Sequence, residues 1–587
     1  MLKKFNYPLP FKLKQTRPRK KTIIAYDLET TNITPNETPR PLYITAYGFY
    51  KDGEEFLRAQ KLNSSDDLLE ILATDFLIPQ HDGFRFVGWN ANNFDVYLIA
   101  RALLLDSRYE LRPYMTRSKS LRGLRVVDMT NMMQWEFLDG MAMTGCMMTL
   151  EKFLHVFAPD YEKLKDVINF EAGEVFDAGN SEHCAYALRD SVGLYHALIK
   201  AQGILKDVFG QILNPTIGNT GIKVFQSFLP VGVSVQELTD DVDTIVREQV
   251  TRGGYCYCAR RYTGKVWKYD INQAYAAAMR EAWLPEGRAT KVHGYWQRYP
   301  GIYQINATHE TNIIPFYYKD NEGHAVFGMR EITDTWITSS ELEQLMQEGW
   351  DIKLKSGYLF SGRFKMKEYV DTLEHTRMNA EGGTNGAKGL MIKAIGNNSY
   401  GKTLEQLDGV EYVLAEECPE GFLPVIPDAE SELYDLPIWV KKNEPQVKDY
   451  HKPHIGAFIT AHVRMVVRRA ALTCAEGWLY ADTDCVVFDR PPVGLDIDAK
   501  RYGAWKVECE GEEYRIITKK VYAKVDNTEK HAKGMNVKRL SADDFEKWSR
   551  GEEPTQTQVH RNNILKVLGG ADMYIERVRR GTKVSKN

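Results

Sequence analysis

Residues 478–488 read Trp-Leu-Tyr-Ala-Asp482-Thr-Asp484-Cys-Val-Val-Phe. Two apolar runs rich in β-forming residues flank a short polar turn, a pattern that predicts a β-hairpin. The hairpin would carry two carboxylates, Asp482 and Asp484, at its tip. An acid in such a place can also simply cap the turn. The hairpin therefore indicates a catalytic site only together with other segments whose side chains could take part in the same reaction.

Two other segments carry side chains that could act together with the carboxylates of this hairpin. The run Val266–Ile271 reads as a strand that ends at an acid, Asp270. Residues 363–401 predict a helical hairpin broken by glycines at 382–386, with a second helix that begins near Ala387. In that second helix Lys393, Asn397 and Tyr400 fall at i, i+4 and i+7, so one helical stripe presents a cation, an amide and an aromatic ring. An exposed helix face would explain the same spacing.

Together these residue types suit nucleotidyl transfer. Attack of a primer 3′-hydroxyl on an α-phosphate uses two metal ions held by acids from separate strands. We therefore expect Asp270 and Asp484 to be metal ligands and Asp482 to support them. Lys393 would hold the triphosphate as a point charge and donate a proton to the leaving pyrophosphate.

The aromatic residues predict how the nucleotide is read. Tyr400 offers a flat face beneath the nascent base pair, and Tyr275 would close the sugar pocket where a ribose 2′-hydroxyl projects. Arg377 and Lys388, on the same helical hairpin, are further candidates for triphosphate contact. The expected nucleotide-binding set is Tyr275, Asn397, Tyr400, Arg377, Lys388 and Lys393.

These segments resemble motifs A, B and C of family B DNA polymerases, in the forms DINQAY, KAIGNNSYG and YADTDC. Lys520-Val-Tyr522 resembles the K-x-Y motif of that family, which contacts the primer terminus. Thr251-Arg-Gly253-Gly254 resembles its Y-x-G-G loop between exonuclease and polymerase parts. The resemblance implies DNA contacts by Lys520, Tyr522, Gly253 and Gly254. The sequence departs from the family pattern at Gln273, Ala274, Ala276, Asn398, Cys485 and Thr251.

A second group of acids lies near the N-terminus. The apolar run Thr22–Tyr26 predicts a buried strand, and Asp27 and Glu29 directly after it share one face of an extended chain. Asp95 opens a predicted helix from Phe94 to Leu104. Tyr186 and Asp190 lie four residues apart, on one side of another helix. Each acid alone could be a capping or surface residue.

Four carboxylates, Asp27, Glu29, Asp95 and Asp190, suffice for phosphodiester hydrolysis with two metal ions, and Tyr186 could orient the attacking water or the scissile phosphate. The segments YDLETT, NANNFD and YALRD resemble the three motifs of the DEDD exonucleases, in the variant with Tyr in the third motif. That resemblance implies an RNase H-like α/β fold, 3′→5′ polarity and DNA contacts at Asn90 and Phe94. Thr149-Leu150 matches a further element of the family or is an ordinary helix start.

The length and the composition of the chain restrict which classes of protein it can belong to. A chain of 587 residues with 43% hydrophobic and 26% charged residues should fold into several packed units. No apolar run is long enough for a membrane span, and residues 1–11 do not read as a secretory signal. The eight cysteines form no CxxC pair, so we expect no structural metal and a reducing, cytoplasmic location, the host cytoplasm if a phage encodes the chain.

Charge is unevenly placed along the chain. The net charge is −3, so any surface for DNA phosphates must be local. Residues 1–21 hold eight Lys or Arg and no acid, and a second basic cluster lies at Arg577–Lys586. Residues 403–437 hold ten acids and no base, a poor lining for a DNA backbone. We read both basic segments either as phosphate contacts or as solvated tails.

The predicted fold is multidomain, α/β and α+β: an RNase H-like 3′→5′ exonuclease domain, then a right-hand polymerase of palm, fingers and thumb with two palm inserts. We expect a break at Asn214-Pro215 and the Gly218/Gly221 pair, and a capping box at Ser340–Glu343. The predicted boundaries are a basic arm (1–21), exonuclease (22–208), palm (209–284 and 455–530), inserts (285–365 and 403–454), fingers (366–402) and thumb (531–587).

The compact length and the position of the two inserts resemble the protein-primed polymerases of phages and linear plasmids. This implies a terminal protein as a partner of insert 285–365 and a role of insert 403–454 in processivity and strand displacement, which its acidity opposes. Expected partners are template-primer DNA and dNTPs, with two Mg²⁺ ions per site that Mn²⁺ can replace; we expect a monomer. Two alternatives stay open: a self-priming polymerase, and a non-catalytic, polymerase-derived DNA-binding protein.

Overall fold

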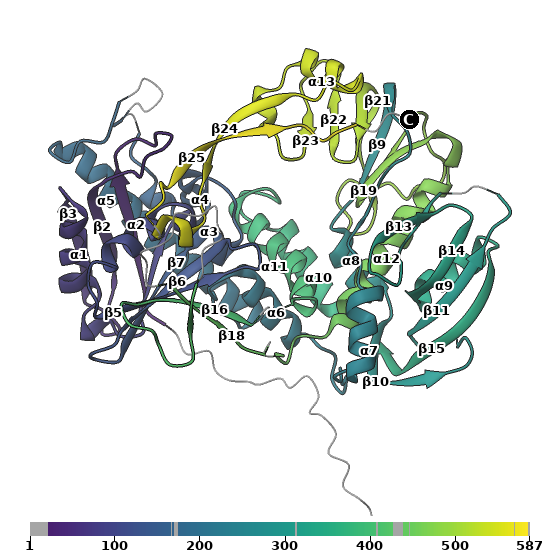
Figure 1. Cartoon of the computed structure of the whole chain (residues 1–587), viewed down its shortest axis with the longest axis horizontal. Helices are drawn as coiled ribbons and strands as arrows, with labels where there is room; N and C mark the ends of the chain where they lie inside the picture. The colour runs from purple at the N-terminus through teal and green to yellow at the C-terminus, as the bar shows by residue number, and fades with distance from the viewer. Residues whose placement is uncertain are drawn as a thin grey trace, which may run out of the picture.

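The chain forms a ring of packed units in which its C-terminal part returns to its N-terminal part (Figure 1). The computed structural model describes residues 21–584 except 166, 169–173, 297, 312–313, 407–408, 426–437, 445–446 and 569. The basic arm, apart from Lys21, and much of the acidic segment 403–437 therefore lie outside the described residues. None of the described helices combines the length and the hydropathy that a bilayer crossing requires.

The N-terminal unit is built on a mixed sheet of order β17-β18-β16-β5-β6-β7-β4-β1-β2-β3. Its central strands β1 (Ile23–Thr30), β4 (Arg85–Gly88) and β7 (Met133–Asp139) run parallel, and β2 (Pro41–Phe49) pairs with β1 antiparallel. The predicted strand at 22–26 is confirmed, although it continues through Asp27 and Glu29 rather than ending before them. Helices α2 (Asp95–Leu103) and α5 (Ser181–Phe209) complete the layers, and α5 packs on β1 and β2.

Residues from far along the chain extend this sheet. Strands β16 (Val410–Leu414), β17 (Leu423–Pro424) and β18 (Ile438–Lys442), all in the second insert, join it at β5 (Tyr109–Met115), where Leu414 pairs with Leu111. Leu414 and Ile438 are buried in the same core as Phe86 and Phe137. The acidic insert is thus part of the N-terminal sheet.

The second unit contains a seven-stranded sheet of order β23-β22-β21-β9-β20-β19-β8. At its centre, β9 (Tyr262–Ile271) lies between β21 (Trp505–Thr518) and β20 (Cys485–Phe488), and β19 (Trp478–Thr483) pairs with β8 (Tyr255–Cys258). The predicted hairpin at 478–488 is confirmed by the β19–β20 pairing. Helices α8 (Ala274–Glu281) and α12 (Pro453–Leu472) pack together, and α12 also contacts β19 and β20.

The first insert forms a separate sheet of order β10-β15-β11-β14: β10 (Leu284–Val292), β15 (Asp351–Phe364), β11 (Gly301–Thr308) and β14 (Glu331–Thr338). A two-stranded ribbon, β12 (Phe316–Lys319) and β13 (Ala325–Gly328), and helix α9 (Ser339–Gln347) belong to it.

The capping box of α9 was predicted at the wrong residues. It is formed by Thr338 and Glu341, not Ser340 and Glu343. Strand β14 runs straight into the helix, so the last strand residue becomes the N-cap. The helix ends just before Gly349, which has a left-handed φ of 83°.

The predicted helical hairpin is confirmed as α10 (Lys367–Met378) and α11 (Ala387–Thr403). The predicted break is confirmed at Asn214-Pro215, in the loop before helix α6 (Ile217–Ser227), but it is wrong for Gly218 and Gly221, which lie inside that helix. Helix α6 packs along α11. A Cβ at Gly221 would be 2.9 Å from the carbonyl oxygen of Ile395. Gly221 therefore permits a close helix–helix contact.

The C-terminal segment connects the two ends of the ring. After α13 (Ala542–Ser549), strands β24 (Thr555–Arg561) and β25 (Tyr574–Arg580) form a ribbon that Figure 1 shows as a yellow arch leading to the N-terminal unit. Between them, helix α14 (Ile564–Leu568) packs on α2 and shares its core. Arg577, Arg579 and Arg580 on β25 are exposed.

Candidate active sites

The four N-terminal acids converge. Asp27 and Glu29 lie on one face of β1, Asp190 on the helix that crosses it, and Asp95 at the start of α2, where its Oδ1 accepts a hydrogen bond of 3.2 Å from the backbone N–H of Leu28. Burial raises the pKa of Asp27, and repulsion by Glu29 and Asp95 raises it further. Burial also raises the pKa of Glu29 to about 7 and that of Asp95 to about 7. Such a cluster favours a bound cation or proton.

Lys163 is a member of this site that sequence reasoning missed. Its Nζ lies 2.5 Å from Asp190 Oδ2 and donates a hydrogen bond of 3.1 Å to the hydroxyl of Tyr186. Burial opposes the charge of the lysine, but the adjacent Asp190 carboxylate outweighs it and raises the pKa of Lys163. The residue precedes α5 in a loop with no periodic pattern, so only the fold reveals its partner.

The NANNFD segment is held by a second missed acid. Asp139 accepts hydrogen bonds from the backbone N–H groups of Asn90 (3.2 Å) and Asn92 (3.1 Å), and Asn90 adopts a left-handed φ of 62°. A cavity of about 430 Å³ lies beside this segment. Its lining includes Asn92 and Asn93 but neither Asn90 nor Phe94, the two residues expected to contact DNA. Phe94 is the N-cap residue of α2.

Thr149 is the N-cap of helix α4 (Leu150–Phe157), where its side chain accepts a hydrogen bond of 3.5 Å from the N–H of Lys152. The ordinary helix start, one of the two predicted interpretations of this segment, therefore describes it.

The second site lies on the central strands of the seven-stranded sheet. Asp270 on β9 is paired with Cys485, so the acid lies beside Asp484 in the turn between β19 and β20. The turn is tight: the N–H of Asp484 donates to the carbonyl of Asp482 at 2.8 Å, and Thr483 has a left-handed φ of 63°. Burial and the neighbouring Asp484 raise the pKa of Asp270 to about 7. Burial raises that of Asp484 to about 6.

These acids line a cavity of about 440 Å³ together with Lys520 and Tyr522. Lys520 Nζ donates to both carboxylate oxygens of Asp482, at 2.8 and 2.9 Å. Within the described residues, by contrast, the Asp270 side chain has no hydrogen bond or ion pair. Asp482 is thus neutralised by the protein, while Asp270 is left open to a ligand.

A fourth acid of the cavity, Glu508, was not predicted. It lies on β21, where its neighbour Lys506 pairs with Asp270, and its charge contributes to the raised pKa of Asp270. The alternating acids of this strand resemble those of any exposed strand, so its sequence carries no distinguishing signal.

Helix α11 brings two predicted residues close to Asp484, although neither lines the cavity itself. Lys393 lowers the pKa of Asp484 by its charge, opposing burial, and the ring of Tyr400 stacks on that of Tyr275 from α8. Asn397 is half-buried on the same helix. Arg377 is buried, and its guanidinium donates to the carbonyl of Thr384 at 3.3 Å. Lys388 lies in the first turn of α11 and has no ion pair among the described residues.

Gly253 and Gly254 lie in the loop before β8. A Cβ on Gly254 would be 2.9 Å from the Cα of Thr483, so glycine lets this loop pack against the turn of Asp482 and Asp484. Tyr522 on β22 (Val521–Lys524) stacks on His531, with ring centroids 5.2 Å apart.

No group of three His, Cys, Asp or Glu side chains in the described part of the chain is arranged to hold a metal ion as it stands. The donors nevertheless suit Mg²⁺, which prefers carboxylate oxygens and keeps several waters. Asp190 Oδ1 is buried without a hydrogen-bond partner, and Asp270 is unpaired within the same described residues. In both sites a bound cation could therefore coordinate carboxylate oxygen atoms that have no hydrogen-bond partner. All eight cysteines, each in the described part, are free thiols.

Comparison with known proteins gives consistent matches. The sequence profile of the family "DNA polymerase type B, organellar and viral" matches residues 168–420. The DNA-directed DNA polymerase of Enterobacteria phage PRD1 is 24% identical over 539 residues, which cover 86% of this chain and 84% of that protein. A probable DNA polymerase of Neurospora intermedia is 22% identical over 362 residues, 57% of this chain but 37% of that protein.

The fold matches that of Phi29 DNA polymerase. An orthorhombic crystal form has a TM-score of 0.70 at 18% identity, covering 96% of this chain and all of that one. The complex of the same enzyme with primer-template DNA and incoming nucleotides has a TM-score of 0.70 at 17% identity and the same coverage. The predicted fold class and the resemblance to family B DNA polymerases are thereby confirmed.

Proposed function

We propose that this chain is a template-directed DNA polymerase of family B that also degrades DNA from the 3′ end. The observation that carries the proposal is the cavity where Asp270 and Asp484, from separate strands, lie side by side, with Lys393 and the stacked pair Tyr275/Tyr400 close to Asp484. A metal-dependent transfer of a nucleotide needs acids that hold the ions and a cation for the phosphates, and the aromatic rings could bound the nucleotide.

In this proposal each group has one task. Asp270 and Asp484 hold the ions, Lys520 keeps Asp482 neutralised, and Lys393 binds the triphosphate. Tyr275 and Tyr400 bound the place of the sugar and the base. When bound, two Mg²⁺ ions would activate the primer 3′-hydroxyl and stabilise the charge on the departing pyrophosphate; Mn²⁺ can take the same ligands.

The N-terminal acids supply the second activity. Asp27 and Glu29 are half-buried beside the buried Asp95 and Asp190, and Tyr186 is held by Lys163. The tyrosine hydroxyl would orient a water or the scissile phosphate, and Lys163 would balance the charge of Asp190. The 3′ end of a DNA strand is the proposed substrate.

A non-catalytic DNA-binding protein is the alternative from another class. It is disfavoured because every carboxylate of both sites is present and Asp270 is unpaired within the described part of the chain. The test is extension of a labelled primer on a DNA template with dNTPs and Mg²⁺. The wild type and Asp496→Asn, which changes an exposed carboxylate, should extend the primer, and Asp484→Ala should not. Extension by none of the three would sink the proposal.

We also propose that synthesis starts on a terminal protein, whose Ser, Thr or Tyr hydroxyl would replace the primer 3′-hydroxyl as nucleophile. The first insert supports this, because its strand β10 is an edge strand of its sheet and carries exposed Arg288 and Lys291. Charge reversal at these two residues should weaken priming on protein more than extension from an oligonucleotide.

Initiation can be tested with labelled dNTP, Mg²⁺ and the protein encoded by the neighbouring gene. A labelled protein band that survives denaturation would support protein priming. Efficient synthesis only from oligonucleotides would refute it, and product on circular single-stranded DNA without primer or partner would identify a self-priming enzyme.

A further inference from the structure

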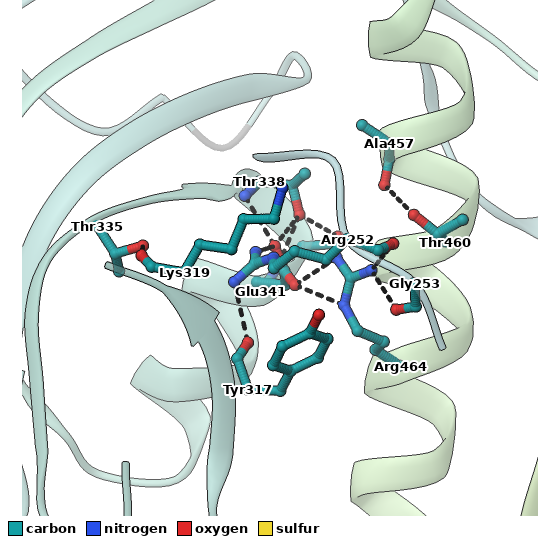
Figure 2. Close-up of polar contacts among 11 residues, drawn as sticks. Arg252, Gly253, Tyr317, Lys319, Thr335, Thr338, Glu341, Ala457, Thr460 and Arg464 are labelled. Atoms are coloured by element: carbon teal, nitrogen blue, oxygen red, sulfur yellow. Dashed lines mark hydrogen bonds and ion pairs between the residues drawn. The ribbon is translucent and has the colours of Figure 1, made fainter. Parts of the chain in front are cut away.

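Three charged side chains are buried together at the junction of the first insert with the polymerase sheet. They are Arg252 from the loop before β8, Glu341 from α9 and Arg464 from α12, with side-chain exposures of 0%, 0% and 1%. Figure 2 shows the carboxylate of Glu341 between the two guanidinium groups. Arg252 Nη2 donates to Glu341 Oε2 at 2.7 Å, and Arg464 Nη2 donates to Glu341 Oε1 at 2.8 Å.

The cluster fixes backbone as well as side chains. Arg464 Nη1 donates to the carbonyl oxygens of Arg252 (2.9 Å) and Gly253 (3.2 Å), as Figure 2 shows. Arg252 donates to the carbonyl of Tyr317 in the insert at 2.9 Å. Glu341 also accepts the N–H of Thr338 at 3.0 Å, closing the capping box of α9. One carboxylate thus joins the insert, helix α12 and the loop 251–254.

That loop leads directly to the proposed polymerase site. Gly254 packs against Thr483, the residue with left-handed φ between Asp482 and Asp484. The next residues continue the contact, because Tyr255 pairs with Thr483 and Cys256 with Asp482 across β8 and β19. A shift of the loop would therefore move the turn that carries Asp484.

Burying three charges is costly, and apolar residues of the same volume are often at least as stabilising. What apolar residues cannot do is fix two backbone carbonyls and a helix cap in one arrangement, because they make no directional contacts. The cluster is therefore better suited to setting a geometry than to adding stability.

We propose that Glu341 is a positioning residue for nucleotidyl transfer: through Arg464 it holds loop 251–254 against Thr483, so that the first insert sets the position of Asp484. The inference rests on the proposed polymerase function. It predicts that an insert residue outside the cavity controls the catalytic rate and the metal requirement of that site alone.

The test compares Glu341→Gln with Glu348→Gln. Glu348 follows α9 and forms an equally short buried ion pair with Arg468 (2.6 Å) on the same helix α12. Arg468, however, holds the carbonyls of Ile314 and Pro315 rather than the loop 251–254. The readouts are single-turnover dNTP incorporation, its dependence on Mg²⁺ concentration, 3′-end degradation of a single-stranded oligonucleotide, and the melting temperature.

We expect Glu341→Gln to lower the incorporation rate about tenfold or more, since misplacing a reacting group by about 1 Å costs up to about 100-fold. The Mg²⁺ concentration for half-maximal rate should rise, while dNTP binding and 3′-end degradation stay near wild type. Glu348→Gln should retain the wild-type rate. An equal loss of incorporation in both variants, a parallel loss of degradation in Glu341→Gln, or an unchanged rate and Mg²⁺ requirement would each overturn the inference. A wild type that incorporates nothing would instead refute the proposed function.

If Glu341→Gln does not fold, Gly254→Ala tests the same route with the ion cluster intact. The added Cβ would press on Thr483 and should produce the same fall in rate and rise in Mg²⁺ requirement. A folded Gly254→Ala with wild-type kinetics would contradict the proposal.

Discussion

The rings of Tyr275 and Tyr400 stack with their centroids 4.5 Å apart and their planes 19° apart. Tyr275 lies on α8, the helix that follows the strand of Asp270, and Tyr400 lies on α11. The stack therefore joins the sheet of the polymerase cavity to the helix of Lys393. Both side chains are only half-exposed, which limits how far either can move. The space above this pair is where a nucleotide sugar would meet Tyr275.

Tyr275→Val should therefore raise the incorporation of ribonucleotides relative to deoxynucleotides. Removing the ring leaves room for a 2′-hydroxyl and frees Tyr400 from its partner, so total activity should also fall. Paired single-nucleotide assays with dNTP and rNTP measure the ratio. Tyr262→Val, at the far end of β9, is the control. An unchanged ratio in Tyr275→Val would assign the discrimination to another residue.

The two proposed activities should separate by mutation, because their acids lie on different sheets. Asp27→Ala with Glu29→Ala should abolish 3′-end degradation and leave primer extension intact. Asp484→Ala should do the reverse. Both assays on both variants, together with melting temperatures, check the result. A folded variant that loses both activities would contradict the two-site interpretation.

Lys163→Met should lower 3′-end degradation by about 100-fold, the usual cost of removing one preorganised electrostatic contact in an active site. The lysine would no longer hold the Tyr186 hydroxyl or balance Asp190. Primer extension should not change. Lys152→Met, on the exposed side of α4, is the matched control. Degradation at the wild-type rate would reduce Lys163 to a structural role.

His454→Phe should make stability less dependent on pH. His454 is buried, stacks on Phe360, and neither ring nitrogen has a hydrogen-bond partner in the described part of the chain. Burial, with the charges of Lys452 and Arg247, lowers its pKa to about 3. The unfolded chain takes up a proton below about pH 6.5 and the folded chain does not, so this contribution is complete above pH 6.5 and is lost as the pH falls.

At pH 5 the variant should therefore be more stable relative to wild type than at pH 7.5, by about 2 kcal/mol. Denaturant titrations at the two pH values measure the difference. His375→Phe, an exposed histidine on α10, should show no such change. A difference between His454→Phe and wild type that is the same at both pH values would contradict the prediction.

Short-range patterns explain what the sequence could predict. The strand at 23–30, the hairpin at 478–488 and the helix pair α10–α11 follow from local periodicity, and their acids follow from motif chemistry. Lys163 and Glu508 could not be predicted as site residues, because the partner of each is brought near only by the fold. Gly221 was misread because a glycine that permits helix contact looks, in sequence, like one that ends a helix.

The pairing of strands that lie far apart in the sequence could not be predicted either. Nothing near residue 414 indicates that its partner is Leu111, since an edge strand accepts any neighbour of suitable register. Likewise, the apolar run Ile564–Leu568 predicts burial but not that α2 covers it.

The late completion of the N-terminal sheet bears on how the chain is made. A ribosome releases residues 23–139 first, yet the edge at β5 stays open until residues 410–442 emerge, and the face of α2 that α14 covers stays exposed until residues 564–573 follow. An open strand edge and an exposed apolar face invite association with other nascent chains. The first unit to be synthesised is thus among the last to be finished, and a gene fragment ending near residue 208 would encode an aggregation-prone, incomplete sheet rather than an independently stable domain.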